Sequence, residues 1–110
     1  MKTLLTNFEQ AVLEAIIALR ADAYGVPVRK RVSEKFNRDI SVGQLYSTLD
    51  RLEQQGFIES NEGGETNSRG GRKKRYYKIC SEGIKALNNY REFMNKNIDE
   101  LTASLNGLIT

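Results

Sequence analysis

Histidine and tryptophan are absent from the 110 residues, and cysteine and proline occur once each. Without histidine the chain lacks the commonest general base and the commonest metal ligand. The single Cys80 excludes an internal disulfide and a cysteine-based zinc site, and we expect it to be a small, buried residue at the end of a strand. No Gly-x-Ser-x-Gly elbow and no phosphate-binding loop ahead of a helix is present. The sequence therefore predicts a protein that is not an enzyme and that needs no cofactor or metal.

Long apolar runs are also missing. No segment approaches the ~20 apolar residues of a membrane span, and no signal-peptide pattern opens the chain. We therefore expect a cytoplasmic protein without a membrane partner. A chain of 110 residues corresponds to one small domain with at most a helical appendage. Because such a domain buries only a modest core, dimerisation would add to its stability.

Positive charge is concentrated in one short segment. The net charge is only +3, but six of the 17 cations lie in residues 69–78, which contain no acid. The remaining 11 cations are outnumbered by the 14 acids of the chain. A local cationic patch on a near-neutral body indicates a polyanionic partner.

The first half of the chain predicts two helices. Thr6 and Glu9 have the spacing of a capping box and predict the start of the first helix. A second helix is expected from about Gly25, with Pro27 in its first turn, where a missing N–H costs nothing. A polar turn follows at residues 37–39, and Ile40 is expected to add a single bridge to a sheet.

A third helix and a hairpin are expected next. Ser41 and Gln44 form a second capping box, and Gly56 is well placed as the C-terminal cap. Apolar residues at helical spacing mark the expected buried side of this helix: Val42, Leu45, Leu49 and Leu52. Residues 57–60 and 75–79 are typical of strands, and the segment between them is rich in Gly, Ser, Asn and Glu. Three helices followed by a hairpin predict a winged helix-turn-helix, which is a mainly α fold with a small β-hairpin (α+β).

The C-terminal segment changes period. Its apolar residues alternate in steps of three and four, as in a coiled-coil seam, and Arg91 is the single interruption. This helix spans nearly 40 Å at 1.5 Å per residue, which is longer than so small a domain needs. We therefore expect residues 1–80 to form the winged helix-turn-helix domain and residues 81–110 a dimerisation helix. The expected dimer contacts are Ile84, Leu87, Met94, Ile98, Leu101, Leu105 and Leu108.

The third helix has the residue types for reading base pairs. If its apolar side faces the core, Gln44, Ser47, Thr48 and Arg51 share one outward arc. Glutamine pairs bidentately with adenine and arginine with guanine, while Ser and Thr contact several base edges. An ordinary solvated face has the same appearance, so the arc alone is weak evidence. Tyr46 is expected either to contact phosphates or to pack.

The basic hairpin strengthens that interpretation. Lysine and arginine neutralise phosphates and release counterions, which drives sequence-independent binding to DNA. Glycines in the loop allow close approach to a backbone or a minor groove. The expected contacts of the wing are Arg69, Arg72, Lys73, Lys74, Arg75 and Tyr76. The alternatives for this patch are a solvated turn and a membrane-surface patch.

Four segments carry a resemblance to a known family. They are LTNFEQAVLEAI, AYGVPVRKRV, LYSTLDRLEQQGFIES and RGGRKKRYYKICSEG. In this order they resemble the PadR-like family of bacterial transcriptional regulators, from Leu5 to about Leu87. The single C-terminal helix is similar to that of the family's short subtype.

The resemblance implies a homodimeric winged-helix repressor whose third helix enters the major groove and whose wing contacts the backbone or the minor groove. It also implies a small hydrophobic or aromatic effector near the dimer interface, although the lack of tryptophan excludes indole stacking there. We therefore expect a sequence-specific regulator of transcription that binds double-stranded DNA and occludes a promoter. The alternatives are a winged-helix protein-interaction module without nucleic-acid binding and a protein that binds duplex RNA.

Overall fold

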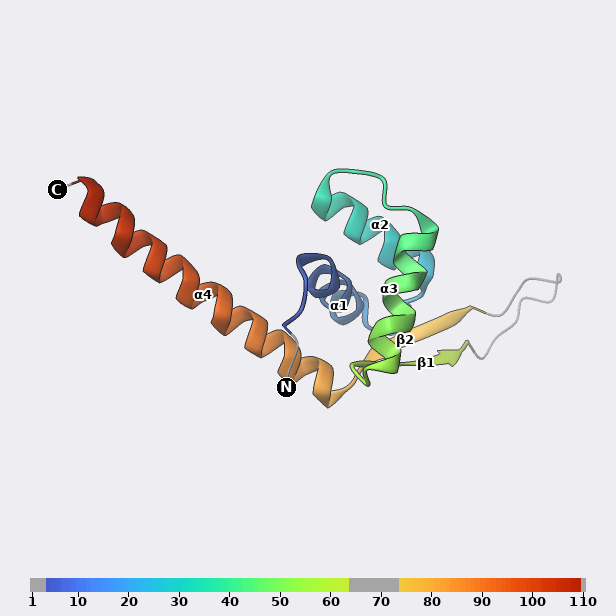
Figure 1. Cartoon of the computed structure of the whole chain (residues 1–110). Helices are drawn as coiled ribbons and strands as arrows, with labels where there is room; N and C mark the ends of the chain where they lie inside the picture. Colours follow the sequence, from blue (N-terminus) through green and yellow to red (C-terminus); the bar gives the residue numbers. More distant parts are fainter. Residues whose placement is uncertain (1–3, 64–73, 110) are drawn as a thin grey trace.

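The computed structural model describes residues 4–63 and 74–109. Four α-helices, one short 3₁₀ helix and one two-stranded hairpin are formed by these residues (Figure 1). Their order is α1 (Asn7–Leu19), η1 (Arg20–Asp22), α2 (Gly25–Phe36), α3 (Val42–Gln54), β1 (Ile58–Glu62), β2 (Arg75–Ile79) and α4 (Ser81–Ile109). The predicted α+β fold, a winged helix-turn-helix followed by a long C-terminal helix, is confirmed.

The starts of the first two helices follow local signals in the sequence. At the start of α1, the Thr6 hydroxyl accepts the Glu9 N–H and the Glu9 carboxylate accepts the Thr6 N–H, so the capping box is complete. Helix α2 begins at Gly25 and carries Pro27 in its first turn, as predicted. Between α2 and α3, Arg29 donates to the Ile40 carbonyl and pairs with Asp39, which fixes the turn before α3.

Both ends of α3 are closed by local hydrogen bonds. The Ser41 hydroxyl accepts the Gln44 N–H at 3.0 Å. At the other end, the Gly56 N–H donates to the Glu53 carbonyl and the Phe57 N–H donates to the Leu52 carbonyl, which is a Schellman motif. Gly56 has a φ of +80°, a conformation that other residues adopt only at a cost. The predicted glycine cap is thus confirmed, and it turns the chain directly into β1.

The two strands are antiparallel and pair from Ile58 opposite Ile79 to Glu62 opposite Arg75. An isolated bridge joins Tyr24 to Tyr76, and the Tyr77 N–H donates to the Ala23 carbonyl at 2.8 Å. The prediction that Ile40 makes this bridge is wrong. The residues just before α2 reach the edge of β2 instead, while the Ile40 side chain is fully buried.

One core joins all these elements. Helices α1, α2 and α3 enclose its centre, and β1 and β2 close it through Ile58 and Tyr77. Burial raises the pKa of Tyr77 to about 12. Only the first turns of α4 reach this core, through Leu87 with Ala86 and Tyr90 beside it. The Tyr90 hydroxyl donates to the Asn7 side chain, which ties α4 to the start of α1.

The rest of α4 projects away from the domain. In Figure 1 the hairpin and α4 leave the helical bundle on opposite sides. The 29-residue helix accounts for much of the elongated outline of 68 × 31 × 21 Å. Among the described residues, no helix combines the length and the apolar character needed to cross a membrane.

Candidate nucleic-acid interface

The exposed side of α3 differs from the predicted arc at two residues. Gln44, Ser47 and Arg51 are exposed, as expected. The expectation that Thr48 points outward is wrong, because this residue is buried and its hydroxyl donates to the Gln44 carbonyl at 3.0 Å. The expectation that Val42 is buried is also wrong, since its exposed fraction is 55%.

Arg51 is held by a residue of another helix. Its Nε–H donates to the Glu9 carboxylate at 3.0 Å, and the two groups form an ion pair. The Arg51 side chain remains 48% exposed, whereas that of Glu9 is 9% exposed. The pair therefore fixes one edge of the guanidinium, and no hydrogen bond to another described residue engages its terminal amino groups.

Tyr46 lies over the start of α2. Gly25 is buried, and a Cβ added there would clash with the Tyr46 hydroxyl. A larger residue at position 25 would require the partly exposed Tyr46 side chain to shift. Tyr46 keeps an exposed fraction of 40%. The packing of this residue is therefore established by the structure, and a phosphate contact by its hydroxyl stays a prediction.

The base of the hairpin is anchored to the same region by an aromatic cluster. The rings of Tyr24 and Tyr76 lie 5.4 Å apart, and Lys74 Nζ lies 4.4 Å from the centroid of the Tyr24 ring. Such a cation–π contact is worth about 0.5–1 kcal/mol at an exposed site. Of the predicted wing residues, Lys74, Arg75 and Tyr76 are described, while Arg69, Arg72 and Lys73 lie outside the described residues.

The charges on the two described strands are nearly balanced. Lys78 faces Glu59 across the ladder, and Arg75 faces Glu62. Arg75 also donates to the Ser60 hydroxyl, which in turn donates to Glu53 of α3. Like Arg51, Arg75 is thus held by neighbours. The excess positive charge of the hairpin therefore belongs mainly to residues 69–73, as the sequence shows.

The predicted dimer contacts on α4 differ in how far they are buried. Leu87 is buried in the core of its own domain, so the expectation that it faces a second copy is wrong. Met94 is half-buried. The exposed members are Ile84, Ile98, Leu101, Leu105 and Leu108. The apolar seam is thus open to solvent over the second half of the helix.

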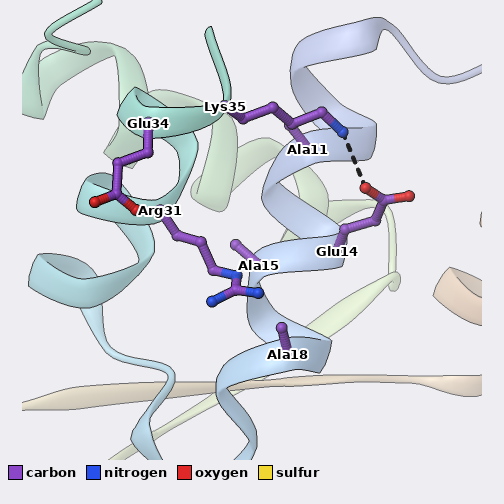
Figure 2. A pocket seen from close by; sticks show the side chains of 7 residues that line it. All are labelled: Ala11, Glu14, Ala15, Ala18, Arg31, Glu34 and Lys35. Atoms are coloured by element: carbon purple, nitrogen blue, oxygen red, sulfur yellow. Dashed lines mark hydrogen bonds and ion pairs between the residues drawn. The ribbon is translucent and has the colours of Figure 1, made fainter. Parts of the chain in front are cut away.

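A separate hollow of about 550 Å³ lies between α1 and α2. Figure 2 shows Ala11, Ala15 and Ala18 along α1, and the ion pair that joins Lys35 of α2 to Glu14 of α1. The other charged residues around it are Arg31 and Glu34, so the charges of the hollow cancel. This balance of charge does not suit a polyanion. Among residues 4–63 and 74–109, no group of His, Cys, Asp or Glu has the arrangement of a metal site.

Three residues were not predicted from the sequence to contribute to this interface. Glu9 pairs with Arg51. Tyr24 bridges to Tyr76 at the base of the hairpin, and Gly25 leaves room for the Tyr46 side chain. Glu9 carried a signal only for helix capping, and nothing in the sequence links it to Arg51, which is 42 positions away. The contacts exist because the fold brings the start of α1 beside α3, and the start of α2 beside α3 and β2.

Comparisons with known proteins agree with this architecture. A family model described as "Transcriptional regulator PadR-like family" matches residues 12–89. A transcriptional regulator from Clostridium thermocellum has a similar structure, with a TM-score of 0.67 and 28% sequence identity over 86% of this chain and 89% of the other. A PadR family transcriptional regulator from Eggerthella lenta gives a TM-score of 0.66 and 26% identity over 86% of this chain and 80% of the other.

A PadR family regulator from Clostridium difficile, at 24% identity and a TM-score of 0.66 over 88% of this chain and 99% of the other, shares the fold. No curated protein matches the chain significantly. The family match covers well over half of the sequence, and the structure places the winged-helix elements in the expected order. This chain belongs to the PadR-like family of transcriptional regulators.

Proposed function

We propose that the protein is a homodimeric repressor that binds a specific site in double-stranded DNA and occludes a promoter. The observation that carries this proposal is the exposed side of α3 with Gln44, Ser47 and Arg51, together with the packing of α3 against β1 of a hairpin whose connecting segment is rich in Lys and Arg. A helix of this width fits the major groove, and Arg and Gln side chains are suited to guanine and adenine edges. Lys and Arg of the hairpin would neutralise phosphates on either side of the groove.

The second part of the proposal is the dimer. The exposed apolar residues on the second half of α4 need a partner, and an identical helix supplies a matching seam. In such a dimer the two α3 helices would insert one helical turn of DNA apart, about 34 Å, into an inverted repeat. A dimer on such a site would exclude polymerase from an overlapping promoter. An effector that releases the DNA stays a prediction.

Selection of bound duplexes from random DNA is the most informative test. We expect an enriched inverted repeat, and its spacing reports the geometry of the dimer. If the two wings neutralise roughly eight phosphates, the plot of log affinity against log salt should have a slope of about −7. A weak or absent salt dependence would instead favour a protein-interaction module, and preference for duplex RNA in direct competition would favour the RNA alternative.

Two variants separate base contacts from phosphate contacts. Arg51→Ala should cost about 1–3 kcal/mol on the preferred site and relax the sequence choice at one position in each half-site. Lys73→Ala should weaken all duplexes alike and reduce the salt slope by about one. Unchanged affinity and slope in Lys73→Ala would show that the hairpin is not the phosphate-binding element.

A further inference from the structure

Glu9 lies outside the recognition helix, yet it is the residue that restrains Arg51. Both oxygens of the Glu9 carboxylate are engaged: Oε1 accepts the Thr6 N–H at 2.9 Å and Oε2 accepts the Arg51 Nε–H at 3.0 Å. The Glu9 N–H donates in turn to the Thr6 hydroxyl at 3.1 Å. A carboxylate that is nearly buried and held at both oxygens has little freedom to rotate, so it forms a fixed acceptor for the arginine.

The geometry of the guanidinium gives this contact a consequence for recognition. Arginine carries five N–H donors in a planar fork. With Nε–H directed at Glu9, the edge formed by the two terminal amino groups remains available, and this is an edge that pairs bidentately with guanine O6 and N7. No hydrogen bond to another described residue restrains the side chains of Gln44 and Ser47 on the same helix. The Arg51 side chain therefore has a defined orientation, whereas those of Gln44 and Ser47 do not.

The charge of Glu9 acts in the same direction. A free arginine on this surface would find phosphate oxygens on any DNA sequence, because that attraction is independent of sequence. The neighbouring carboxylate offsets part of this charge while leaving the directional donors in place. An arginine that is ion-paired on one edge thus gains little binding energy from a phosphate at an arbitrary sequence. It gains more from a guanine whose O6 and N7 accept both of its terminal amino groups.

We propose that Glu9 is a positioning residue for DNA recognition: it orients Arg51 for bidentate contact with a guanine and suppresses the contact of Arg51 with phosphates. The proposal rests on the proposed DNA-binding function and assigns to the first helix a part in sequence choice.

Glu9→Gln is the decisive variant because it preserves the cap of α1. Glutamine serves as well as glutamate at this position of a capping box, so its carbonyl oxygen keeps the Thr6 N–H. Its amide nitrogen then faces the Arg51 Nε–H, donor against donor, and the link to Arg51 is lost. Thr6→Ala is the matched control: it removes the hydroxyl that accepts the Glu9 N–H and leaves both oxygens of Glu9 in place.

The measurement is the ratio of affinities for the selected duplex and a scrambled duplex, together with the melting temperature. In Glu9→Gln we expect this ratio to fall at least about fivefold, in the range of losing a base contact, while affinity for the scrambled duplex is maintained or rises. In Thr6→Ala we expect a lower melting temperature, as for loss of a helix cap, and a ratio within about twofold of the wild type. The double variant Glu9→Gln/Arg51→Ala should show the ratio of Arg51→Ala alone, because the two residues act as one unit.

The failures of the two proposals are distinguishable. If Arg51→Ala lowers the affinity ratio and Glu9→Gln does not, the positioning role of Glu9 is wrong while DNA recognition by Arg51 stands. If Arg51→Ala has no effect, or if the wild type does not prefer any duplex, the proposed function itself fails at this residue. Arg51→Lys tests the same inference in a chain with an intact Glu9, because lysine keeps the charge and lacks the fork. The ratio of affinities for the selected and scrambled duplexes should fall in Arg51→Lys as it does in Arg51→Ala. A ratio equal to that of the wild type would overturn the proposed bidentate contact of the guanidinium.

Discussion

At the level of single residues, burial decided which side chains of α3 are available to a partner. Leu45, Thr48, Leu49 and Leu52 form the buried side at steps of three and four. Val42 continues the same line by one turn, but it lies beyond the end of the core and is exposed. Thr48 is small enough to enter the core, where its hydroxyl is satisfied by the carbonyl one turn earlier. The spacing of the apolar residues therefore identifies which face of a helix is buried. It does not show over what length of the helix the rest of the domain covers that face.

Gly43 has no structural reason within the chain to be glycine. A Cβ at this position would have no heavy atom within 4 Å, and its φ is negative as in any helix. Gly43→Ala should therefore raise the free energy of unfolding by about 0.5–1 kcal/mol, because alanine is the better helix former. If the exposed side of α3 enters a groove, the added methyl group should at the same time weaken DNA binding. Thermal melting measures the change in stability, and a binding titration on the same preparation measures the change in DNA affinity. A variant that is more stable and binds as well as the wild type would show that DNA does not approach this position closely.

The buried phenol of Tyr77 predicts a loss of stability at high pH. Its pKa is raised from 10.0 to about 12, chiefly by burial, so the folded chain keeps the proton more strongly than the unfolded chain does. The contribution of Tyr77 to stability is therefore complete below pH 10 and is lost as the pH rises from 10 to 12. Denaturant titrations across this range should show a smaller decline in Tyr77→Phe than in the wild type, since phenylalanine has no proton to lose. An equal decline in both proteins would contradict the assignment to Tyr77.

At the level of elements, α3 and the hairpin are fixed to each other by side chains and by the chain itself. The Schellman motif at Gly56 leads α3 directly into β1, and the hydrogen bonds from Arg75 to Ser60 and from Ser60 to Glu53 join the strands to α3. On the other edge, Tyr24 ties β2 to the start of α2. The base of the wing therefore has a set position relative to α3, which a duplex spanning both elements requires.

The aromatic anchor of the hairpin is tested by two substitutions of Tyr24. Tyr24→Leu keeps an apolar side chain but removes the ring that contacts Tyr76 and Lys74. We expect a loss of about 0.5–1.5 kcal/mol in stability and weaker binding to all duplexes alike, because the wing is less well held. Tyr24→Phe retains the ring and should behave as the wild type in both measurements. A change of sequence preference in Tyr24→Leu would instead indicate that this residue affects base reading through α3.

At the level of the whole molecule, α4 has two separate parts. Its first turns complete the core of the domain through Leu87, while its second half presents apolar residues to solvent. The boundary predicted at residue 80 is therefore a boundary between elements, since the packing of the domain continues past it. This apolar seam is exposed in one copy and regular in spacing, so a second copy of the helix would cover it.

Leu101→Lys tests the proposed dimer without disturbing the core, because Leu101 is 59% exposed in the single chain. We expect a shift to monomer in sedimentation and a loss of affinity for the inverted repeat of about 100-fold or more, as the second half-site no longer binds in the same event. Ala103→Lys places the same charge two residues away, outside the predicted seam, and should leave both properties unchanged. A dimer that persists in Leu101→Lys would place the interface elsewhere.

The sequence by itself determined the elements, because their signals are local. Helix caps, a glycine cap and the apolar period act within a few residues, and the predicted starts at Thr6, Gly25 and Ser41 and the strand Arg75–Ile79 were confirmed for this reason. Of the two predicted capping boxes, the one at Thr6 and Glu9 is complete, whereas at Ser41 and Gln44 only the Ser41 hydroxyl takes part. Only the tertiary structure decided the contacts between elements. The ion pair of Glu9 with Arg51, the bridge of Tyr24 with Tyr76 and the burial of Leu87 join residues far apart in the chain. Such contacts depend on how the helices and strands pack and on how far each apolar face is covered by neighbouring elements. A short segment of sequence does not determine this packing.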